Sequence, residues 1–216
     1  DAYSCTTLVA TLPQNALPEG SHPVSVTNPA PAACSSEENV SIAVVGSPEI
    51  TAPPQPDLVC TGEDESLVLT GDGFLDAGGA LPSVTIGGQT LQASSVSGCS
   101  DVGGTQIPTR SCTTLTVDIP AGTLPEGQLD VSVTNPAPAA CSSPPVTLYA
   151  LPPPVVDASR PSPPCTQDPT ALDITGSGFA VVDGVQPVVE VEGSQVNITS
   201  MSGCTAYPGP AETVQI

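Results

Sequence analysis

An internal repeat constrains this chain more than any other feature. Residues 4–36 align with residues 111–143 without a gap, at an offset of 107 residues, and both stretches end in VSVTNPAPAACSS. The TGDGF of residues 70–74 returns as the TGSGF of residues 175–179, at an offset of 105 residues. Self-similarity at a fixed period indicates a repeat architecture, so we predict one structural unit of about 105 residues.

This period divides the chain into three segments. Residues 47–150 form a complete repeat, residues 1–46 form the C-terminal part of the repeat before it, and residues 151–216 form the N-terminal part of the repeat after it. The chain then covers close to two periods, and we interpret it as an excerpt from a longer array. Pro152, Pro153 and Pro154 predict a stiff linker between repeats.

Short apolar runs in the complete repeat alternate with polar residues. Alternation with period two between turn residues predicts half-buried antiparallel strands. Gly87-Gly88 predicts a hairpin turn. Seven short strands in about 105 residues are typical of an immunoglobulin-like (Ig-like) β-sandwich. The alternating apolar positions are Leu67, Leu69, Val84, Ile86, Leu115, Val117, Ile119, Leu129, Val131, Val133, Val146 and Leu148.

Several motifs carry a family resemblance. They are Pro48-Glu49-Ile50, the LVLTGDGF of residues 67–74, the LTVDIP of residues 115–120 and the VSVTN of residues 131–135, and the second of these returns at residues 172–179. Together they resemble the IPT/TIG domain, an Ig-like fold of cell-surface receptors, bacterial surface proteins and some transcription factors. The resemblance covers all three segments. It implies an all-β chain of tandem Ig-like (IPT/TIG) β-sandwich repeats, from a family that serves mainly as spacers and interaction modules.

Aromatic residues are too few to build large cores. The chain has no Trp, and its phenylalanines are Phe74 and Phe179, each in the repeated GxGF motif. We expect each phenylalanine to pack into a core of small aliphatic side chains, below glycines that allow a bend or bulge. Burial stabilises by roughly 25 cal/mol per Å² of apolar area, so a small core needs a further stabiliser.

The charge balance excludes several kinds of partner. The chain has 22 acidic residues against Arg110 and Arg160, and a net charge of −20. Nucleic acids and anionic membranes repel such a chain, because binding them requires clustered basic residues. No run of about 18 apolar residues is present, so we expect no membrane-spanning segment.

Cysteines supply the expected stabiliser. Eight cysteines with almost no basic residues indicate an oxidising compartment, so we expect the protein outside the cell or on its surface. The complete repeat holds Cys60, Cys99, Cys112 and Cys141, which allow three connectivities. One alternative joins Cys99 to Cys112 through a short loop and leaves Cys60 to pair with Cys141.

The third segment argues against that alternative. It keeps Cys204, the counterpart of Cys99, but has Gly209 at the position of Cys112, which would leave Cys204 without its partner. We therefore favour pairs within each segment and keep bonds between repeats open. The predicted disulfides are Cys5–Cys34, Cys60–Cys99, Cys112–Cys141 and Cys165–Cys204.

Other candidate sites are weaker. Acidic residues around residues 57–76 supply hard oxygen ligands that could hold Ca²⁺, although a solvated acidic surface explains them as well. No other cofactor is expected. Asn39 and Asn197 begin N-glycosylation sequons. His22 is the only histidine, so it is the only imidazole that could serve as a catalytic base. We expect no enzyme activity. The calcium candidates are Asp57, Glu63, Asp64, Glu65, Asp72 and Asp76.

The sequence therefore favours a structural function. We expect a component of an extracellular fibre, stalk or surface array, whose partners are copies of itself or neighbouring repeats. The alternative is an adhesin, or a module of a larger cell-surface protein that binds carbohydrate or another surface protein. Scarce aromatic side chains count against sugar stacking, because Tyr3, Tyr149 and Tyr207 are the three tyrosines.

Overall fold

The computed structural model describes residues 4–13, 16–37, 40–105, 107–160, 170–182, 184–207 and 214–215. Every regular element in these ranges is a β-strand, so the described chain is all-β. None of the described residues lies in a helix that could cross a membrane.

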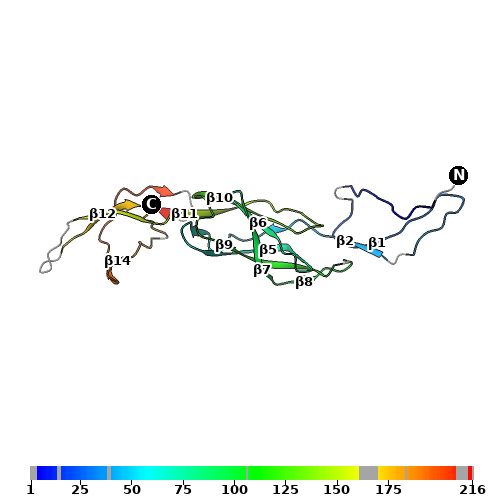
Figure 1. The fold of residues 1–216 in the computed structure, drawn as a ribbon, viewed down its shortest axis with the longest axis horizontal. Helices are drawn as coiled ribbons and strands as arrows, with labels where there is room; N and C mark the ends of the chain where they lie inside the picture. Colours follow the sequence, from blue (N-terminus) through cyan, green and yellow to red (C-terminus); the bar gives the residue numbers. More distant parts are fainter. Residues whose placement is uncertain are drawn as a thin grey trace.

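Residues 47–151 fold into a sandwich of two layers (Figure 1). The strands follow the order β3-β5-β9-β7-β6-β10-β11-β4, and β8 pairs with β9. The long β7 joins the layers, because residues 89–92 pair with β6 and residues 93–97 pair with β9. The strands are β3 (Glu49–Ile50), β4 (Leu58–Cys60), β5 (Glu65–Ala77), β6 (Ser83–Ile86), β7 (Gln89–Ser97), β8 (Ser100–Asp101), β9 (Thr109–Ile119), β10 (Gly127–Thr134) and β11 (Val146–Leu151).

The chain changes layers at its entrance to the sandwich. β3 pairs antiparallel with β5 in one layer, whereas β4 pairs parallel with β11 in the other. The Pro-rich stretch 51–57 makes the crossing, with Pro54 fully buried. Proline has no backbone N–H to give to a sheet ladder, so a proline-rich stretch interrupts one long strand into two short ones. The short strands β4 and β8 were not predicted from the pattern of apolar residues.

The predicted alternation is confirmed in the core. Its apolar positions are buried, apart from Val146, which is partly buried and packs against the core. Phe74 is fully buried among aliphatic side chains, as predicted. The largest fully buried side chains are Phe74, Leu67, Leu69, Ile86, Leu115, Leu148, Val84, Val117, Val131 and Val133.

Glycines shape β5 and the β6–β7 hairpin. Gly71 passes so close to β3 that an added Cβ would overlap the carbonyl oxygen of Glu49. Gly73 has φ +73°, and the pairing of β5 with β9 shifts register between Thr70 and Phe74, which is the predicted bulge. Gly87-Gly88 has positive φ at both positions and closes the predicted hairpin.

Two further groups of strands lie beyond the ends of the sandwich (Figure 1). We define the leading end as the one that carries Ser47 and the trailing end as the one that carries Leu151. Beyond the leading end lie β1 (Gly20–Val24) and β2 (Val40–Val44). Beyond the trailing end lie β12 (Val155–Arg160), β13 (Asp173–Ser177), β14 (Val189–Val191), β15 (Ser194–Val196), β16 (Ala206–Tyr207) and β17 (Val214–Gln215).

The pair β1–β2 has the register of the pair β10–β11. Val24 lies opposite Val40, and Val131 lies opposite Val146. The loops that connect the two strands of each pair also match. The hydroxyls of Thr27 and Ser35 lie 2.7 Å apart, and those of Thr134 and Ser142 lie 2.8 Å apart.

The third segment repeats the geometry around the GxGF motif. Gly176 approaches the carbonyl oxygen of Val155 as Gly71 approaches that of Glu49. The aromatic ring tips of Phe74 and Phe179 lie 2.8 and 2.7 Å from the Cβ that each of these glycines lacks. Gly178, like Gly73, has φ +73°.

Candidate functional site

The six calcium candidates divide between the two ends of the sandwich. Residues 57–65 lie at the trailing end, where Glu65 pairs with Ile119. Asp72 and Asp76 lie near the leading end of β5. Among the described residues no three Asp, Glu, His or Cys side chains come together as a metal site. The structure therefore does not gather these carboxylates around one ion.

Two of these carboxylates hold the local backbone instead. Asp64 Oδ1 accepts the N–H of Ala121 at 2.8 Å, which joins the turn before β5 to the turn after β9. Asp76 Oδ1 accepts the N–H of Gly79 at 2.8 Å, and its Oδ2 forms an ion pair with Arg110. These contacts assign a structural role to both side chains.

The ion pair changes the acidity of Asp76. Its side chain is 11% exposed, whereas that of Arg110 is 51% exposed. The hydrogen bond from Arg110, followed by the hydrogen bond from the N–H of Gly79, holds the pKa of the Asp76 carboxyl below its ordinary value. The charged pair thus joins adjacent strands β5 and β9 at the leading end, where Asp76 lies opposite Arg110.

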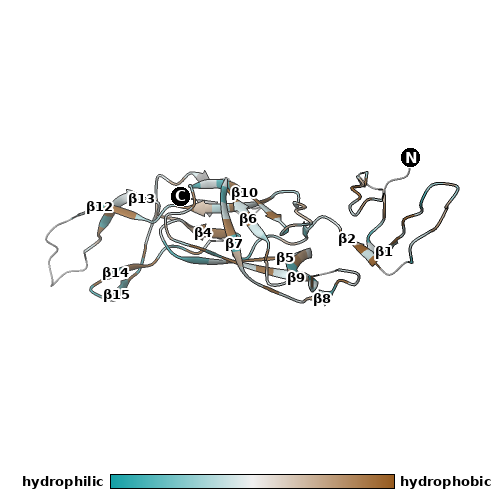
Figure 2. Cartoon of the chain, turned by 45° about the vertical axis from the view of Figure 1, so that its right-hand side comes forward, coloured by the Kyte–Doolittle hydropathy of each residue, from teal (hydrophilic) through white to brown (hydrophobic). Residues whose placement is uncertain are grey.

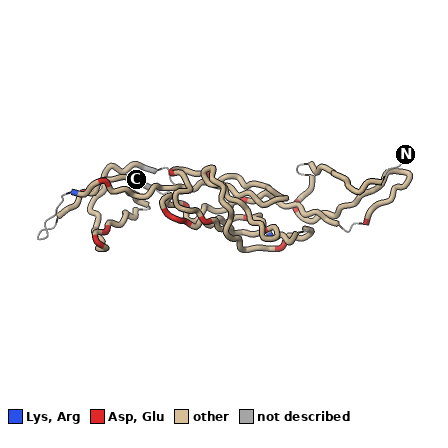
Figure 3. The backbone as a smooth tube through the Cα atoms, viewed as in Figure 1, with Lys and Arg blue, Asp and Glu red and all other residues tan. Residues whose placement is uncertain are grey.

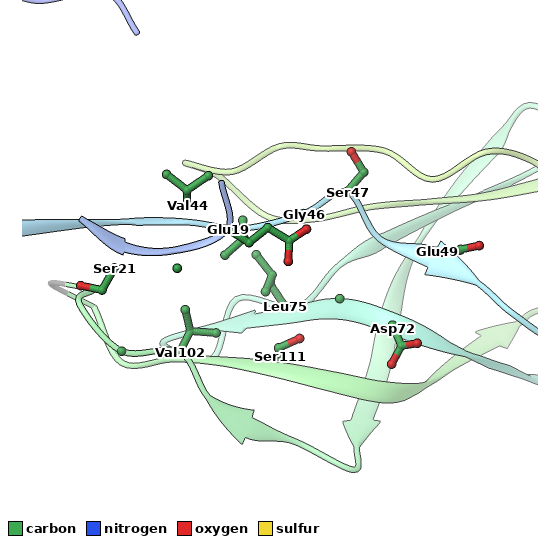
Figure 4. Close-up of a pocket in the computed structure, with 14 residues that line it drawn as sticks. Glu19, Ser21, Val44, Gly46, Ser47, Glu49, Asp72, Leu75, Val102 and Ser111 are labelled. Carbon is green, nitrogen blue, oxygen red and sulfur yellow. The ribbon is translucent and has the colours of Figure 1, made fainter. Parts of the chain in front are cut away.

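A cleft of about 490 Å³ lies at the leading end, between residues 19–47 and the sandwich (Figure 4). Three carboxylates line it, those of Glu19, Glu49 and Asp72, without a basic side chain. Apolar groups line it as well, including Leu75 and Val102. No histidine lines the cleft, so its carboxylates have no histidine partner there. One wall belongs to residues 19–46 and the other to the sandwich.

One loop makes the contact across this junction. The backbone at Gly104, with φ +79°, lies against Ser21 of β1 and Ser41 of β2. The loop is anchored to the sandwich, because the N–H of Val102 donates to the carbonyl oxygen of Thr109 at 2.8 Å. The loop between β8 and β9 thus contacts the β1–β2 pair of the preceding segment at Gly104.

A second contact holds the trailing end to the chain that follows it. The N–H of Thr61 donates to the carbonyl oxygen of Leu151 at 2.8 Å. A Cβ at Gly62 would lie 3.0 Å from the ring of Pro153, so the loop packs directly on the Pro-rich linker. Each end of the sandwich therefore contacts the adjoining segment of the chain, β1–β2 at the leading end and the Pro-rich linker at the trailing end.

The lone histidine has a local contact. Nε2 of His22 lies 2.8 Å from the carbonyl oxygen of Pro18. In the alignment of repeats His22 takes the position of Leu129, which is buried in the sandwich. Among the described residues, its hydrogen-bond partner is this backbone oxygen.

The predicted disulfides of the complete repeat are wrong. The structure joins Cys99 to Cys112, with the two Cα atoms 3.9 Å apart. The reason is the pairing of β8 with β9, which sets Ser100 opposite Ser111. This excludes the predicted pairs Cys60–Cys99 and Cys112–Cys141.

The positions of the remaining cysteines explain the error. Cys60 lies at the trailing end, opposite Leu151, whereas Cys99 lies near the leading end. Cys112 lies in the layer of β5, but Cys141 follows β10 in the other layer. Cys60 and Cys141 are half-buried thiols.

The outer segments give a similar result. Cys5 and Cys34, which were predicted to pair, are both exposed thiols without a bond between them. Cys204 is also exposed, and its predicted partner Cys165 lies outside the described residues. Of the two sequons, Asn197 is exposed directly after β15, and Asn39 lies outside the described residues.

Acidic residues are spread along the chain, over all three segments (Figure 3). The contacts of Gly104 and Gly62 at the two junctions were not predicted from the sequence. The Gly103-Gly104 pair between β8 and β9 was the available signal, since glycine allows close approach of two backbones. The chain matches no protein-family model and no curated protein sequence.

Proposed function

We propose that this chain is a section of an extracellular fibre, stalk or surface array built from tandem, disulfide-stabilised Ig-like repeats of the IPT/TIG type. In this proposal the protein carries mechanical tension along the fibre and sets the distance between the parts that the fibre connects. It has no enzymatic activity. Residues 47–150 are the complete repeat, and the flanking segments belong to its two neighbours.

The observation that carries the proposal is the duplicated geometry on either side of the sandwich. The register of β1–β2 matches that of β10–β11, and the GxGF contacts of β12–β13 match those of β3–β5. Sequence identity between residues 24–36 and 131–143 accompanies the match. Tandem copies of one unit are the simplest origin of such a pattern.

The two junctions support a rod over a flexible string. Gly104 rests on β1 and β2 at one end, and Gly62 rests on Pro153 at the other. Proline in the linker restricts the backbone further. The three segments follow one another along the long axis of the molecule, with β1–β2 and β12–β13 at opposite ends of the sandwich (Figure 1).

The test uses polypeptides with two, three and four copies of residues 47–153, measured by small-angle X-ray scattering. A rod adds a constant length with each copy. A flexible string grows roughly with the square root of the number of copies. In a matched control, glycine replaces Pro152 and Pro153 in every copy, which should shift the growth in length toward the square-root dependence of a flexible string. Square-root growth without these replacements would contradict the proposal.

A glycan array tests the adhesin alternative. The structural proposal expects no selective binding by residues 1–216, because sugar-stacking surfaces need aromatic side chains and the chain has two Phe, three Tyr and no Trp. Selective binding that survives high salt would favour the adhesin.

A further inference from the structure

A glycosylation sequon lies at the end of a hairpin in the third segment. Asn197-Ile198-Thr199 directly follows β15, and both Asn197 and Thr199 are exposed. N-linked glycosylation requires this triplet, with any residue except proline in the middle, and a place on the surface for a bulky sugar. The position of the hairpin within the repeat decides whether the second requirement is met.

The β14–β15 hairpin has the register of the β6–β7 hairpin. Val189 lies opposite Val196, as Val84 lies opposite Leu91. Figure 2 shows β14 and β15 with hydrophilic residues towards the tip of their hairpin. The two hairpins therefore pair their strands in the same way.

The turns of the two hairpins match as well. The turn between β14 and β15 has φ +48° at Glu192 and +77° at Gly193. The turn between β6 and β7 has φ +54° and +85° at Gly87-Gly88. Residues 197–199 therefore take the place that residues 92–94 hold in the complete sandwich.

The complete sandwich shows which way this triplet faces. Gln92 and Ser94 are exposed, whereas Ala93 between them is 5% exposed. Successive side chains of a strand point to opposite faces of the sheet. In a complete repeat the asparagine and the hydroxyl group of the sequon thus face solvent, and Ile198 faces the core.

The side-chain amide at this position is within reach of two backbone acceptors only in the longer residue. Nε2 of Gln92 donates to the carbonyl oxygens of Leu81 at 2.6 Å and of Pro82 at 2.9 Å. Asparagine has one methylene group fewer, so its amide nitrogen falls short of both oxygens. The nitrogen of Asn197 is therefore free to carry a sugar.

An exposed valine is the expected neighbour of this sugar. Val188 is 67% exposed and is the counterpart of Ser83, which lies opposite Gln92 on the solvent-facing side of β6. A glycan on Asn197 would extend over Val188 and shield it from water.

We propose that Asn197 carries an N-linked glycan on the solvent-facing side of the β14–β15 hairpin. The inference rests on the proposed function in one respect, because it treats residues 151–216 as part of a repeat like residues 47–150. The junction contacts at Gly104 and Gly62 do not involve the counterpart position Gln92. The glycan therefore leaves the contacts between successive repeats unchanged.

The sugar donor is an oligosaccharide linked to a lipid through pyrophosphate, and an oligosaccharyltransferase catalyses the transfer. The amide nitrogen Nδ2 of Asn197 attacks C1 of the first sugar. The C1–O bond to the pyrophosphate breaks, the lipid pyrophosphate leaves with the bonding electrons, and the nitrogen gives up one proton. No group is oxidised or reduced, and Thr199 supplies the hydroxyl that the transferase recognises.

The experiment secretes residues 1–216 from a eukaryotic host that performs N-linked glycosylation, and measures the intact mass of the product. We expect a glycan that a peptide amidase removes, with conversion of residue 197 to aspartate in the peptide map. Asn197→Gln and Thr199→Ala should each remove the glycan from this peptide. Thr199→Ser should keep it, because serine also supplies the hydroxyl.

A matched pair of variants in the complete sandwich tests the orientation. Gln92→Asn creates the triplet Asn-Ala-Ser on the exposed side, and we expect a glycosylated, folded protein. Ala93→Asn creates the triplet Asn-Ser-Ser one residue later, on the buried side. We expect no folded, secreted protein with a glycan at residue 93, because the sugar would have to enter the core.

Two outcomes would overturn the proposal. One is an unmodified Asn197 in a host that does glycosylate the Gln92→Asn variant. The other is a folded, secreted Ala93→Asn variant with a glycan at residue 93, since the orientation argument would then be wrong. Either result leaves the scattering test of multiple copies of residues 47–153 unaffected, so the proposed function stands or falls separately.

Discussion

The side chain of Asn135 holds the bulge at Gly73, 62 residues away in the sequence. Its amide donates to the carbonyl oxygen of Gly73 at 2.8 Å, and its Oδ1 accepts the N–H of Leu75 at 3.0 Å. Asn135 is only 2% exposed. It follows β10 in one layer, whereas Gly73 and Leu75 belong to β5 in the other, so one side chain connects the two layers.

Asn135→Ala should destabilise the sandwich. The substitution leaves the buried N–H of Leu75 and the half-buried carbonyl oxygen of Gly73 without their partner, which costs about 1–3 kcal/mol. Urea unfolding of residues 1–216 measures the change. Asn28→Ala is the matched control, because its exposed side chain should change stability by at most about 0.5 kcal/mol. Equal effects of the two substitutions would exclude the role assigned to Asn135.

The Asp76–Arg110 ion pair should make stability depend on pH. The folded pKa of Asp76 is lower than its unfolded pKa, so the folded state favours the charged form. Its contribution is complete above the unfolded value of about 4 and disappears as the pH falls through the folded pKa. Asp76→Asn should therefore destabilise the protein near neutral pH and flatten this acid limb, as urea midpoints from pH 2 to pH 7 would reveal. An unchanged acid limb in the variant would contradict the assignment.

Non-reducing peptide mapping should find Cys99 linked to Cys112. The bond spans 13 residues. Closing a loop of this size stabilises by about 3 kcal/mol in the chain-entropy model. Joint replacement of both cysteines by alanine should lower stability by a comparable amount, whereas Cys60→Ala should have a smaller effect. A Cys60–Cys99 peptide in the map would restore the pairing expected from the sequence.

Gly104→Val should loosen the junction without unfolding the sandwich. Its new Cβ would overlap Ser21, and the left-handed φ of +79° adds strain. Gly122→Val carries a similar strain at φ +72° with no heavy atom within 4 Å of the added Cβ. Small-angle scattering should show a wider range of shapes for Gly104→Val than for this control. Identical scattering from both variants would mean that the loop does not hold the junction.

Much of the fold follows from local sequence patterns. The alternation at Leu115, Val117 and Ile119 placed β9, and Gly87-Gly88 placed the hairpin, because both depend on neighbours in sequence. The change of layer between β3 and β4 was not predicted. The Pro-rich stretch 51–57 separates these two short strands, and each pairs with a strand far away in the sequence.

The cysteine pairing failed for a different reason. The prediction used Gly209, a single position of the third segment, to infer the connectivity of every repeat. A disulfide instead depends on distance, because it requires Cα atoms within about 7 Å of each other. That distance depends on β8, a strand of two residues that carries almost no periodic signal. The junction contacts of Gly104 and Gly62 escaped notice for the same reason, because they join residues far apart in sequence.

The parallel pairing of β4 with β11 has a mechanical consequence. In the proposed array, one neighbouring repeat would pull on β11 at Leu151, and the other would pull at Ser47 on β3, from which the chain leads on to β4. Tension along the proposed array would draw these two parallel strands in opposite directions along their own axes. Their hydrogen bonds stand across this direction and must break together, in shear, rather than one after another as in a zipper. A short ladder under shear resists a brief force when it ruptures slowly compared with the duration of that force. This rupture rate is a kinetic property, and equilibrium unfolding does not measure it.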